Sequence, residues 1–367
     1  MMSIPDKIQT WQMVQPATFD RETGKSIPGR LEKTEIPTPE LDNGEVLVKV
    51  AGCGVCHTDL SYFYEGTPTV SSPPLTLGHE ISGTVAAGDE RWIGKEVIIP
   101  AVMPCRQCVL CKIGKGNRCL NQKMPGNSLG IYGGFADYIP VPVIDLCEIN
   151  DRKGIGLPYF AALADAGTTP YQAARRAGLQ YGDRAVIIGI RGGVGKFMGL
   201  IASAMGAGTI IGIDIKDDLE DALGMGADYI IDAKGKDAKT VSKEFKTLCK
   251  ENGMPTYGWK IFEVSGALQG QNIGLSLVSF LSTMIVVGYN NKKVEYSISR
   301  LMAFEAEIKG TWGCLPEYYP YVLEMALQGK IPLDELVETR PMSTIIDTFE
   351  ENHKNPPDKR VVLIPDF

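Results

Sequence analysis

Histidine is scarce in this chain, with three in 367 residues, and long apolar runs are missing. The longest apolar stretch, residues 275–289, is too short and too rich in serine to cross a bilayer. Basic residues are not in excess, because 37 lysines and arginines face 44 aspartates and glutamates. A chain of net charge -7 lacks the positive surface that nucleic-acid binding requires. We therefore expect no membrane span and no nucleic-acid partner.

Two of the three histidines lie in short motifs with a cysteine or an acidic residue. The motifs are CHTD at residues 56–59 and GHE at residues 78–80. Zinc prefers thiolate and imidazole ligands, and a catalytic zinc keeps one of its four positions open for water or substrate. The two motifs therefore indicate half of a catalytic zinc site. Taken alone, they also fit an ordinary buried cysteine and two loop histidines.

A compact set of four cysteines follows in the stretch PCRQCVLCKIGKGNRC. These are Cys105, Cys108, Cys111 and Cys119, with two, two and seven residues between them. One loop with this spacing can surround a single ion with four thiolates, and such a closed site is structural. Disulfides and an iron-sulfur cluster are the alternatives. The chain begins without the apolar run of a secretory signal, which favours zinc and a cytoplasmic location. The remaining cysteines are expected to be small buried side chains, namely Cys53, Cys147, Cys249 and Cys314.

The pattern of the chain changes near Asp165. Before it, short alternating strands and turn clusters predict an irregular β-rich domain. After it, strands alternate with helices, which predicts an α/β fold with a doubly wound parallel sheet. Strands are expected within 185–190, 209–214, 229–232, 260–264, 284–288 and 307–312, and helices within 194–205 and 237–253. The last stretch, with helices within 316–330 and 343–355 and a strand within 359–365, is expected to pack on the first domain.

The turn after the first of these strands is rich in glycine, with the sequence GIRGGVG at residues 189–195. Such a turn lets a pyrophosphate approach the backbone at a helix N-terminus. Asp214 ends the next strand, close to the spacing of about 20 residues expected for the acid that binds the adenosine ribose. A carboxylate there repels a 2'-phosphate and favours NAD over NADP, although Lys216 would soften that discrimination. Alternatively, Asp214 only caps the following turn.

The order of these motifs carries a family resemblance. CGVCHTDL, GHE, the four-cysteine lobe, ADAGTTPYQAA and the glycine turn together resemble the zinc-dependent medium-chain alcohol dehydrogenases over essentially the whole chain. The resemblance implies a GroES-like β-rich catalytic domain at 1–165 and 312–367, with its structural zinc lobe near 103–120. It also implies an inserted Rossmann domain that binds NAD, at 166–311.

The resemblance further implies roles for single residues near the first zinc. Cys56, His79 and Asp165 match the catalytic zinc ligands, and Glu80 matches an acid that can serve as an alternate ligand. Asp59 matches a carboxylate that orients the ligand histidine.

Other matched positions concern the proton path and the cofactor. Thr58 matches the hydroxyl that binds the substrate oxygen and begins a proton relay, whereas Ser61 stands where many members have the histidine of that relay. The cofactor-facing positions implied are His57, Thr169, Ser265 and Arg360, together with Gly189, Gly192, Gly193, Val194, Gly195, Asp214 and Lys216.

The implied activity is hydride transfer from a secondary alcohol to NAD, with two zinc ions per subunit of a dimer or tetramer. Segments such as QTWQMVQP and QKMPGNSLGIYGG resemble members that oxidise a cyclic, allylic alcohol carried on a coenzyme A thioester. An acyl-CoA is therefore the expected small-molecule substrate. The alternatives are a small alcohol or polyol, a zinc-assisted addition of water or a thiol to an enoyl thioester, and a silent NAD-binding protein. The aromatic run at 62–64 either lines a substrate pocket or belongs to the core.

Overall fold

The computed structural model describes residues 4–20 and 26–367. The chain forms two compact units. The first consists of Met1–Thr168, Gly313–Leu327 and Pro332–Phe367, and the second of Thr169–Trp312 and Gln328–Ile331. The C-terminal stretch therefore belongs to the same compact unit as the N-terminal part of the chain.

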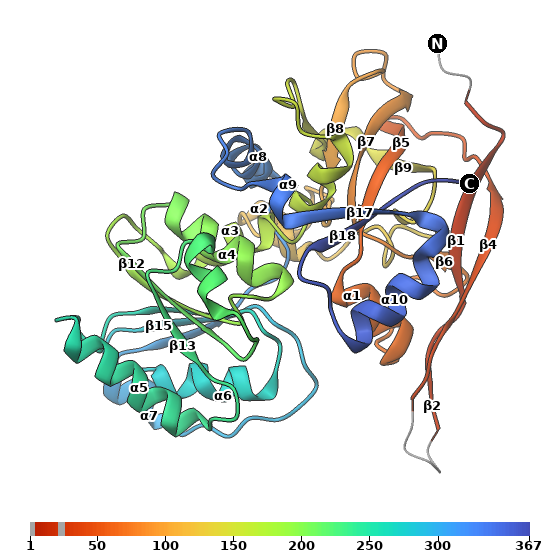
Figure 1. Cartoon of the computed structure of the whole chain (residues 1–367). Coiled ribbons are helices and arrows are strands. Elements are labelled where there is room, and N and C mark those ends of the chain that lie inside the picture. The colour runs from red at the N-terminus through yellow and green to blue at the C-terminus, as the bar shows by residue number, and fades with distance from the viewer. Residues whose placement is uncertain (1–3, 21–25) are drawn as a thin grey trace. The chain divides into compact units, whose positions relative to one another are not determined.

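The first unit is built on a seven-stranded sheet with the order β10-β8-β7-β5-β18-β17, in which β9 also pairs with β5 (Figure 1). Its strands are β5 (Glu45–Gly54), β7 (Glu80–Ala87), β8 (Glu96–Ile99), β9 (Tyr138–Pro142), β10 (Cys147–Glu148), β17 (Val337–Pro341) and β18 (Arg360–Ile364). The last strand, β18, places Val362 and Leu363 opposite Gly54 and Cys53 of β5. Strand β5 is buried along almost its whole length because neighbours cover both of its faces.

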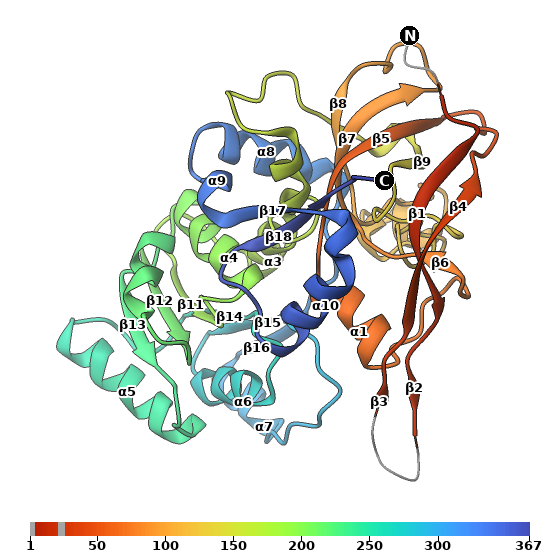
Figure 2. The same ribbon diagram turned by 45° about the vertical axis from the view of Figure 1, so that its right-hand side comes forward.

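A smaller sheet and several helices complete this unit. The sheet has the order β4 (Arg30–Pro37), β1 (Lys7–Gln15) and β6 (Leu75–Thr76), and β2 (Thr18–Phe19) pairs with β3 (Ser26–Ile27). The helices are α1 (His57–Tyr64), α2 (Val109–Lys112), α8 (Tyr319–Leu327), α9 (Leu333–Leu336) and α10 (Ile345–Lys354). Both ribbon views show α1 beside α10, where Phe63 meets Phe349 edge to face (Figures 1 and 2).

The second unit contains a six-stranded, all-parallel sheet with the order β13-β12-β11-β14-β15-β16. The strands are β11 (Arg184–Ile188), β12 (Thr209–Asp214), β13 (Tyr229–Asp232), β14 (Lys260–Glu263), β15 (Thr283–Val286) and β16 (Glu307–Gly310). The helices are α3 (Thr168–Ala177), α4 (Gly193–Ala204), α5 (Ala238–Glu251), α6 (Leu268–Leu277) and α7 (Ser299–Phe304). The chain order reverses between β11 and β14, and ligands of such sheets bind beyond the carboxyl ends of the strands at this point.

Two apolar cores cover the two faces of this parallel sheet. Val186 and Ile188 of β11 belong to one core, and Ala185 and Ile187 belong to the other, because successive side chains of a strand point to opposite faces. This double burial explains why the strands appear in the sequence as continuous apolar runs. The predicted α/β fold class is confirmed.

The structure adds elements that the sequence did not predict, notably α6, α7 and β17. The apolar stretch 275–289 is shared between the end of α6 and β15. Within the described ranges, no helix combines the length and the apolar character needed to cross a bilayer.

Candidate metal centres and dinucleotide-binding turn

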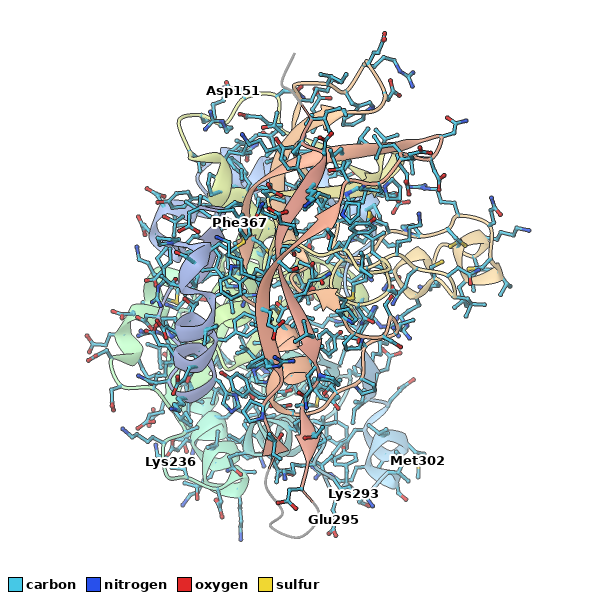
Figure 3. The ribbon with its side chains drawn as sticks, turned by 90° about the vertical axis from the view of Figure 1, so that its right-hand side faces the viewer. Asp151, Lys236, Lys293, Glu295, Met302 and Phe367 are labelled. Atoms are coloured by element: carbon cyan, nitrogen blue, oxygen red, sulfur yellow. The ribbon has the colours of Figure 1, made fainter. Side chains whose placement is uncertain are left out.

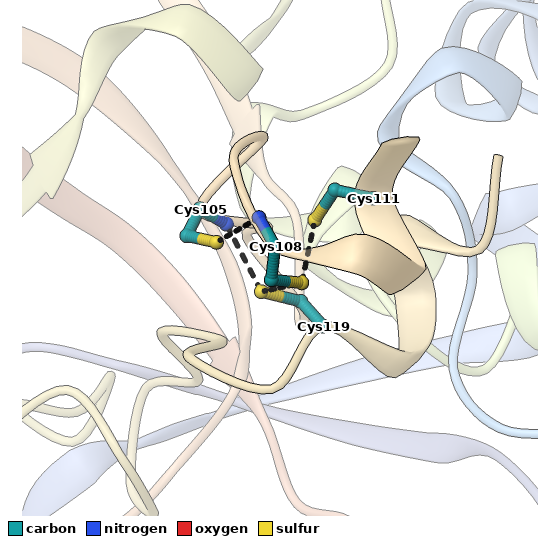
Figure 4. Close-up of side chains that lie close together, drawn as sticks. All are labelled: Cys105, Cys108, Cys111 and Cys119. Carbon is teal, nitrogen blue, oxygen red and sulfur yellow. Dashed lines mark hydrogen bonds between the residues drawn. The ribbon is translucent and has the colours of Figure 1, made fainter. Parts of the chain in front are cut away.

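The four clustered cysteines converge around one point (Figure 4). Their sulfur atoms lie within 4.8 Å of one another, and the Cys108 sulfur is 3.5 Å from that of Cys111 and 3.8 Å from that of Cys119. Four thiolates at zinc-sulfur distances of about 2.3 Å in a tetrahedron are separated by about 3.8 Å. All nine cysteines are free, so no disulfide competes for these sulfurs. The cluster fits a closed zinc site.

Backbone amides support thiolates in this cluster. Cys105 donates its N–H to the Cys119 sulfur at 3.2 Å, and Asn121 donates to the same sulfur at 3.3 Å. Backbone N–H groups of Leu120 and Cys111 lower the pKa of Cys108 to about 6. Burial has the opposite effect at Cys111, whose pKa rises to about 12. A bound divalent cation would offset that cost, because a coordinated thiol is deprotonated.

The second cluster brings together residues from three separate parts of the sequence. Cys56, His79, Glu80 and Asp165 each offer one ligand atom, and these atoms lie within 4.8 Å of one another. The Asp165 carboxylate is 3.8 Å from the Cys56 sulfur and 3.5 Å from His79 Nε2. Cys56 precedes α1, His79 precedes β7, and Asp165 follows a 3-10 helix over Leu157–Leu163.

The surroundings of the His79 ring suit metal binding. It is 1% exposed, and within the described residues neither ring nitrogen has a hydrogen-bond partner of acceptable geometry. Burial opposes a charge on the ring, but nearby Asp59 and Cys56 together raise the pKa of His79 well above its ordinary value. A buried imidazole that faces a thiol and a carboxylate is the donor set of a catalytic zinc site.

Asp59 fixes the backbone on both sides of this cluster. Its carboxylate accepts a hydrogen bond from the Cys56 N–H at 3.1 Å and another from the Gly78 N–H at 3.0 Å. The same carboxylate is 3.3 Å from His79 Nδ1. One fully buried side chain therefore orients two candidate ligands.

Glu80 and Arg360 form a buried ion pair that the sequence did not predict. Arg360 donates from Nε to Glu80 Oε2 at 2.9 Å and from Nη2 to Oε1. The Ala166 N–H also donates to Oε1, at 3.1 Å. Burial raises the pKa of Glu80 while the guanidinium opposes that shift. Arg360 was assigned to the cofactor phosphates, and the structure places its guanidinium on Glu80; the phosphate contact remains a prediction.

Of the residues around the expected proton relay, Ser61 is buried and His57 is exposed. Thr58 lies in the first turn of α1, and Ser61 is buried with its hydroxyl donating to the Thr58 carbonyl at 2.8 Å. Ser61 thus donates its hydrogen bond inside its own helix, and its part in a proton relay stays a prediction. His57 is exposed, with Nε2 3.7 Å from a Glu65 carboxylate oxygen.

The aromatic run after this motif belongs largely to the core. Tyr62 and Phe63 are buried in the apolar cluster of the first unit, and Tyr64 stacks on His353 with ring centroids 4.1 Å apart. Of the two interpretations offered by the sequence, the core one is correct for Tyr62 and Phe63.

The glycine turn joins β11 to α4 as predicted. Gly189 adopts a φ of 88°, which favours glycine, and Gly192 is the residue that caps the N-terminus of α4. A Cβ atom at position 195 would lie 1.9 Å from the Gly189 carbonyl oxygen, so the helix can approach the strand only with glycine there. The turn has the shape in which backbone N–H groups receive a pyrophosphate.

Asp214 ties this turn to the end of β12. Its carboxylate accepts from the Arg191 N–H at 2.7 Å, the Ile215 N–H at 2.7 Å and the Lys216 N–H at 3.2 Å. The structure thus shows the turn-capping contacts offered as the alternative, and the ribose contact stays a prediction. Thr169 is buried near the start of α3.

Glu263 is a functional candidate that the sequence reasoning missed. It ends β14, is 0% exposed, and one oxygen accepts from the Ser265 N–H at 2.9 Å, the Ser265 hydroxyl at 2.5 Å and the Gly266 N–H at 3.1 Å. Burial raises the pKa of Glu263. A Cβ atom on Gly189 would lie 2.8 Å from the Ser265 Cα, so Glu263 positions a segment that touches the glycine turn. The available signal was an acid closing the apolar strand KIFE.

Comparisons with known proteins agree with this geometry. Residues 42–151 match the alcohol dehydrogenase GroES-like domain, and residues 193–328 match the zinc-binding dehydrogenase family. An alcohol dehydrogenase of Geobacillus stearothermophilus is 31% identical over 340 residues, which cover 91% of this chain and 95% of the relative. A sorbitol dehydrogenase of Bombyx mori is 30% identical over 325 residues, covering 85% and 88%.

The fold has solved counterparts as well. An alcohol dehydrogenase from Thermotoga maritima superposes with a TM-score of 0.83 at 21% identity, covering 98% of this chain and all of that one. A GroES-like domain, a parallel dinucleotide-type sheet and two clusters that fit zinc define a zinc-dependent dehydrogenase. The chain belongs to the medium-chain alcohol dehydrogenase family, as the sequence motifs implied.

Proposed function

We propose that the protein oxidises a secondary alcohol by hydride transfer to NAD, with the catalytic zinc held by Cys56, His79 and Asp165. The observation that carries the proposal is the buried His79 ring, which has no hydrogen-bond partner of acceptable geometry among residues 4–20 and 26–367 and lies close to the other two side chains. Bound zinc supplies Lewis-acid chemistry, which makes an alcohol a better hydride donor. Asp59 orients His79 and the backbone at Cys56, and the Thr58 hydroxyl is assigned to the substrate oxygen.

Asp214 supports NAD as the cofactor. Its oriented carboxylate suits ribose hydroxyls and opposes a 2'-phosphate. A relative from Sulfolobus acidocaldarius, 30% identical over 335 residues, is an NAD-dependent alcohol dehydrogenase. Replacing Asp214 by alanine is expected to shift the preference towards NADP by about tenfold in kcat/KM. An unchanged ratio of the two cofactors would refute the ribose role.

For the substrate, we propose 6-hydroxycyclohex-1-ene-1-carbonyl-CoA, oxidised to the 6-oxo enone in anaerobic benzoyl-CoA degradation. The support is the resemblance of segments such as QKMPGNSLGIYGG, described above. A second candidate is a small alcohol or polyol, because the relatives include sorbitol dehydrogenases and an L-galactonate-5-dehydrogenase of Escherichia coli. NAD reduction measured with the cyclic acyl-CoA alcohol and with simple alcohols separates the two. Activity confined to small alcohols rejects the CoA assignment.

Two further activities are distinguished by simple measurements. Consumption of an enoyl thioester without any change in NADH absorbance would indicate addition of water or a thiol. Absence of zinc beyond one ion per chain would indicate a silent nucleotide-binding protein. The convergence of Cys56, His79 and Asp165 argues against the silent protein.

A homo-oligomer is also proposed. In the described part of the second unit, β16 is an edge strand that pairs only with β15, and the adjoining α7 exposes Met302 (Figure 3). Open strand edges and exposed apolar side chains are surfaces on which a second copy can pack. Light scattering gives the mass directly, and a monomer would reject this part of the proposal.

A further inference from the structure

Arg191 lies within the glycine turn, and the proposed function gives its side chain no role. Its main-chain N–H donates to the Asp214 carboxylate at 2.7 Å. Its side chain is only 4% exposed, and its Nη1 donates to the Asp218 carbonyl and lies 2.8 Å from Asp221 Oδ2. The residue whose backbone binds the carboxylate assigned to the ribose therefore also carries a buried cation.

The segment that receives this guanidinium is strongly acidic. Residues 214–221, with the sequence DIKDDLED, contain five acids and one lysine. Asp218 begins the 3-10 helix Leu219–Met225 with a φ of 56°, and Asp221 lies in the first turn of that helix. Asp221 is 58% exposed at its side chain, whereas its partner Arg191 is buried. The pair thus joins the glycine turn to the segment after β12.

Arginine is the side chain that most often binds a phosphate through two parallel hydrogen bonds. An arginine near the ribose acid is also the usual means by which this type of fold accepts a 2'-phosphate. Arg191 has the chemistry and the neighbourhood for that role, but Asp221 and the Asp218 carbonyl engage its guanidinium.

We infer that Asp221 determines cofactor specificity: by pairing with Arg191, it withholds that guanidinium from a 2'-phosphate. Discrimination against NADP then has two layers. Asp214 repels the 2'-phosphate, and Asp221 pairs with the Arg191 guanidinium that would otherwise bind that phosphate. The inference rests on the proposed binding of a dinucleotide at the glycine turn.

The test is Asp221→Asn in the full-length, zinc-loaded protein. Asparagine keeps the size of the side chain and removes the charge that holds Arg191. Dissociation constants for NADH and NADPH are measured by titrating nicotinamide fluorescence. The ratio of the two constants is expected to move towards NADPH by about tenfold, and the shift should shrink as salt is raised.

Glu220→Gln is the matched control, because Glu220 is an exposed acid in the same helical turn and its loss changes the net charge equally. Glu220→Gln is expected to change the ratio of the NADH and NADPH dissociation constants by about twofold at most, because only the long-range electrostatic effect of the lost charge remains. Equal shifts in the two variants would overturn the inference, since the pairing with Arg191 would then be irrelevant.

The double variant Arg191→Gln with Asp221→Asn completes the design. If Arg191 supplies the new phosphate contact, the gain of the single variant disappears in the double one; a gain that persists overturns the inference. Failure of the unmodified protein to bind NADH would instead reject the proposed function. Normal NADH binding with no shift in Asp221→Asn rejects only the role of Asp221.

Discussion

Replacing Asp59 by asparagine tests whether one buried carboxylate controls zinc binding at the His79 cluster. Asp59 accepts from the N–H groups of Cys56 and Gly78, and it faces His79 Nδ1 at 3.3 Å. An asparagine amide offers one oxygen and one NH2 group, so one of these backbone N–H groups would face the NH2 group and lose its acceptor. Because Asp59 is fully buried, water cannot compensate.

The expected effect has two parts. Leaving a buried N–H unsatisfied costs about 1–3 kcal/mol, and weakening hydrogen bonds to a charged acceptor adds a similar amount. We therefore expect the metal-free variant to lose about 2–6 kcal/mol of unfolding free energy. Loss of a partner that orients a metal-binding histidine typically weakens the metal by about 10- to 100-fold.

Zinc affinity is measured by competition with a chromophoric chelator, and unfolding free energy by urea titration in excess EDTA. The EDTA removes zinc, so that metal binding does not contribute to the measured unfolding free energy. Asp137→Asn is the control, since Asp137 accepts the Gln9 N–H at 2.9 Å in the same unit but lies outside the cluster. It should lower stability without lowering zinc affinity. The reasoning fails if Asp59→Asn binds zinc as tightly as the unmodified protein, or if both variants lose zinc equally.

Three further changes probe the remaining parts of the site. Asp165→Asn should keep the fold but release one of two zinc ions and reduce kcat/KM by at least about 100-fold; full zinc content and rate would show that Asp165 is not a ligand. Cys119→Ser should lower zinc content from about two ions to one and unfold the cysteine lobe or break assembly, checked by metal analysis and light scattering. Glu263 has a raised pKa, so its folded form gains stability when protonated and loses it as pH rises through that pKa. Glu263→Gln should therefore reduce the fall in unfolding free energy as pH rises above 4.5, the ordinary pKa of a glutamate, and an unchanged slope would contradict the assignment.

Features that depend on neighbouring residues were predictable from the sequence. The four cysteines lie within one loop, so their spacing alone indicated one site. The strand over Thr209–Asp214 was predicted with its observed bounds because a strand buried on both faces is a continuous apolar run. Gly189 and Gly195 were recognisable because few other residues fit such a close strand–helix turn.

Features that depend on distant residues were not predictable in the same way. Arg360 and Glu80 are separated by 280 positions, and the pairing of β5 with both β18 and β7 brings them together. Glu263 carries no motif, and its importance comes from three hydrogen bonds that a turn closes around it. Single residues in the sequence do not reveal which long-range pair compensates a buried charge.

During synthesis on the ribosome, the two metal clusters are completed at different times. The cysteine lobe is complete once Cys119 has been made, so the nascent chain can take up its first ion early. The second cluster must wait for Asp165, and Glu80 must wait for Arg360, which follows it by 280 positions. Until then, the first unit carries a carboxylate without its counter-ion and a central sheet without β18. A chain made beyond Asp165 but not as far as Arg360 would therefore have a complete cysteine lobe and a Glu80 carboxylate without its counter-ion.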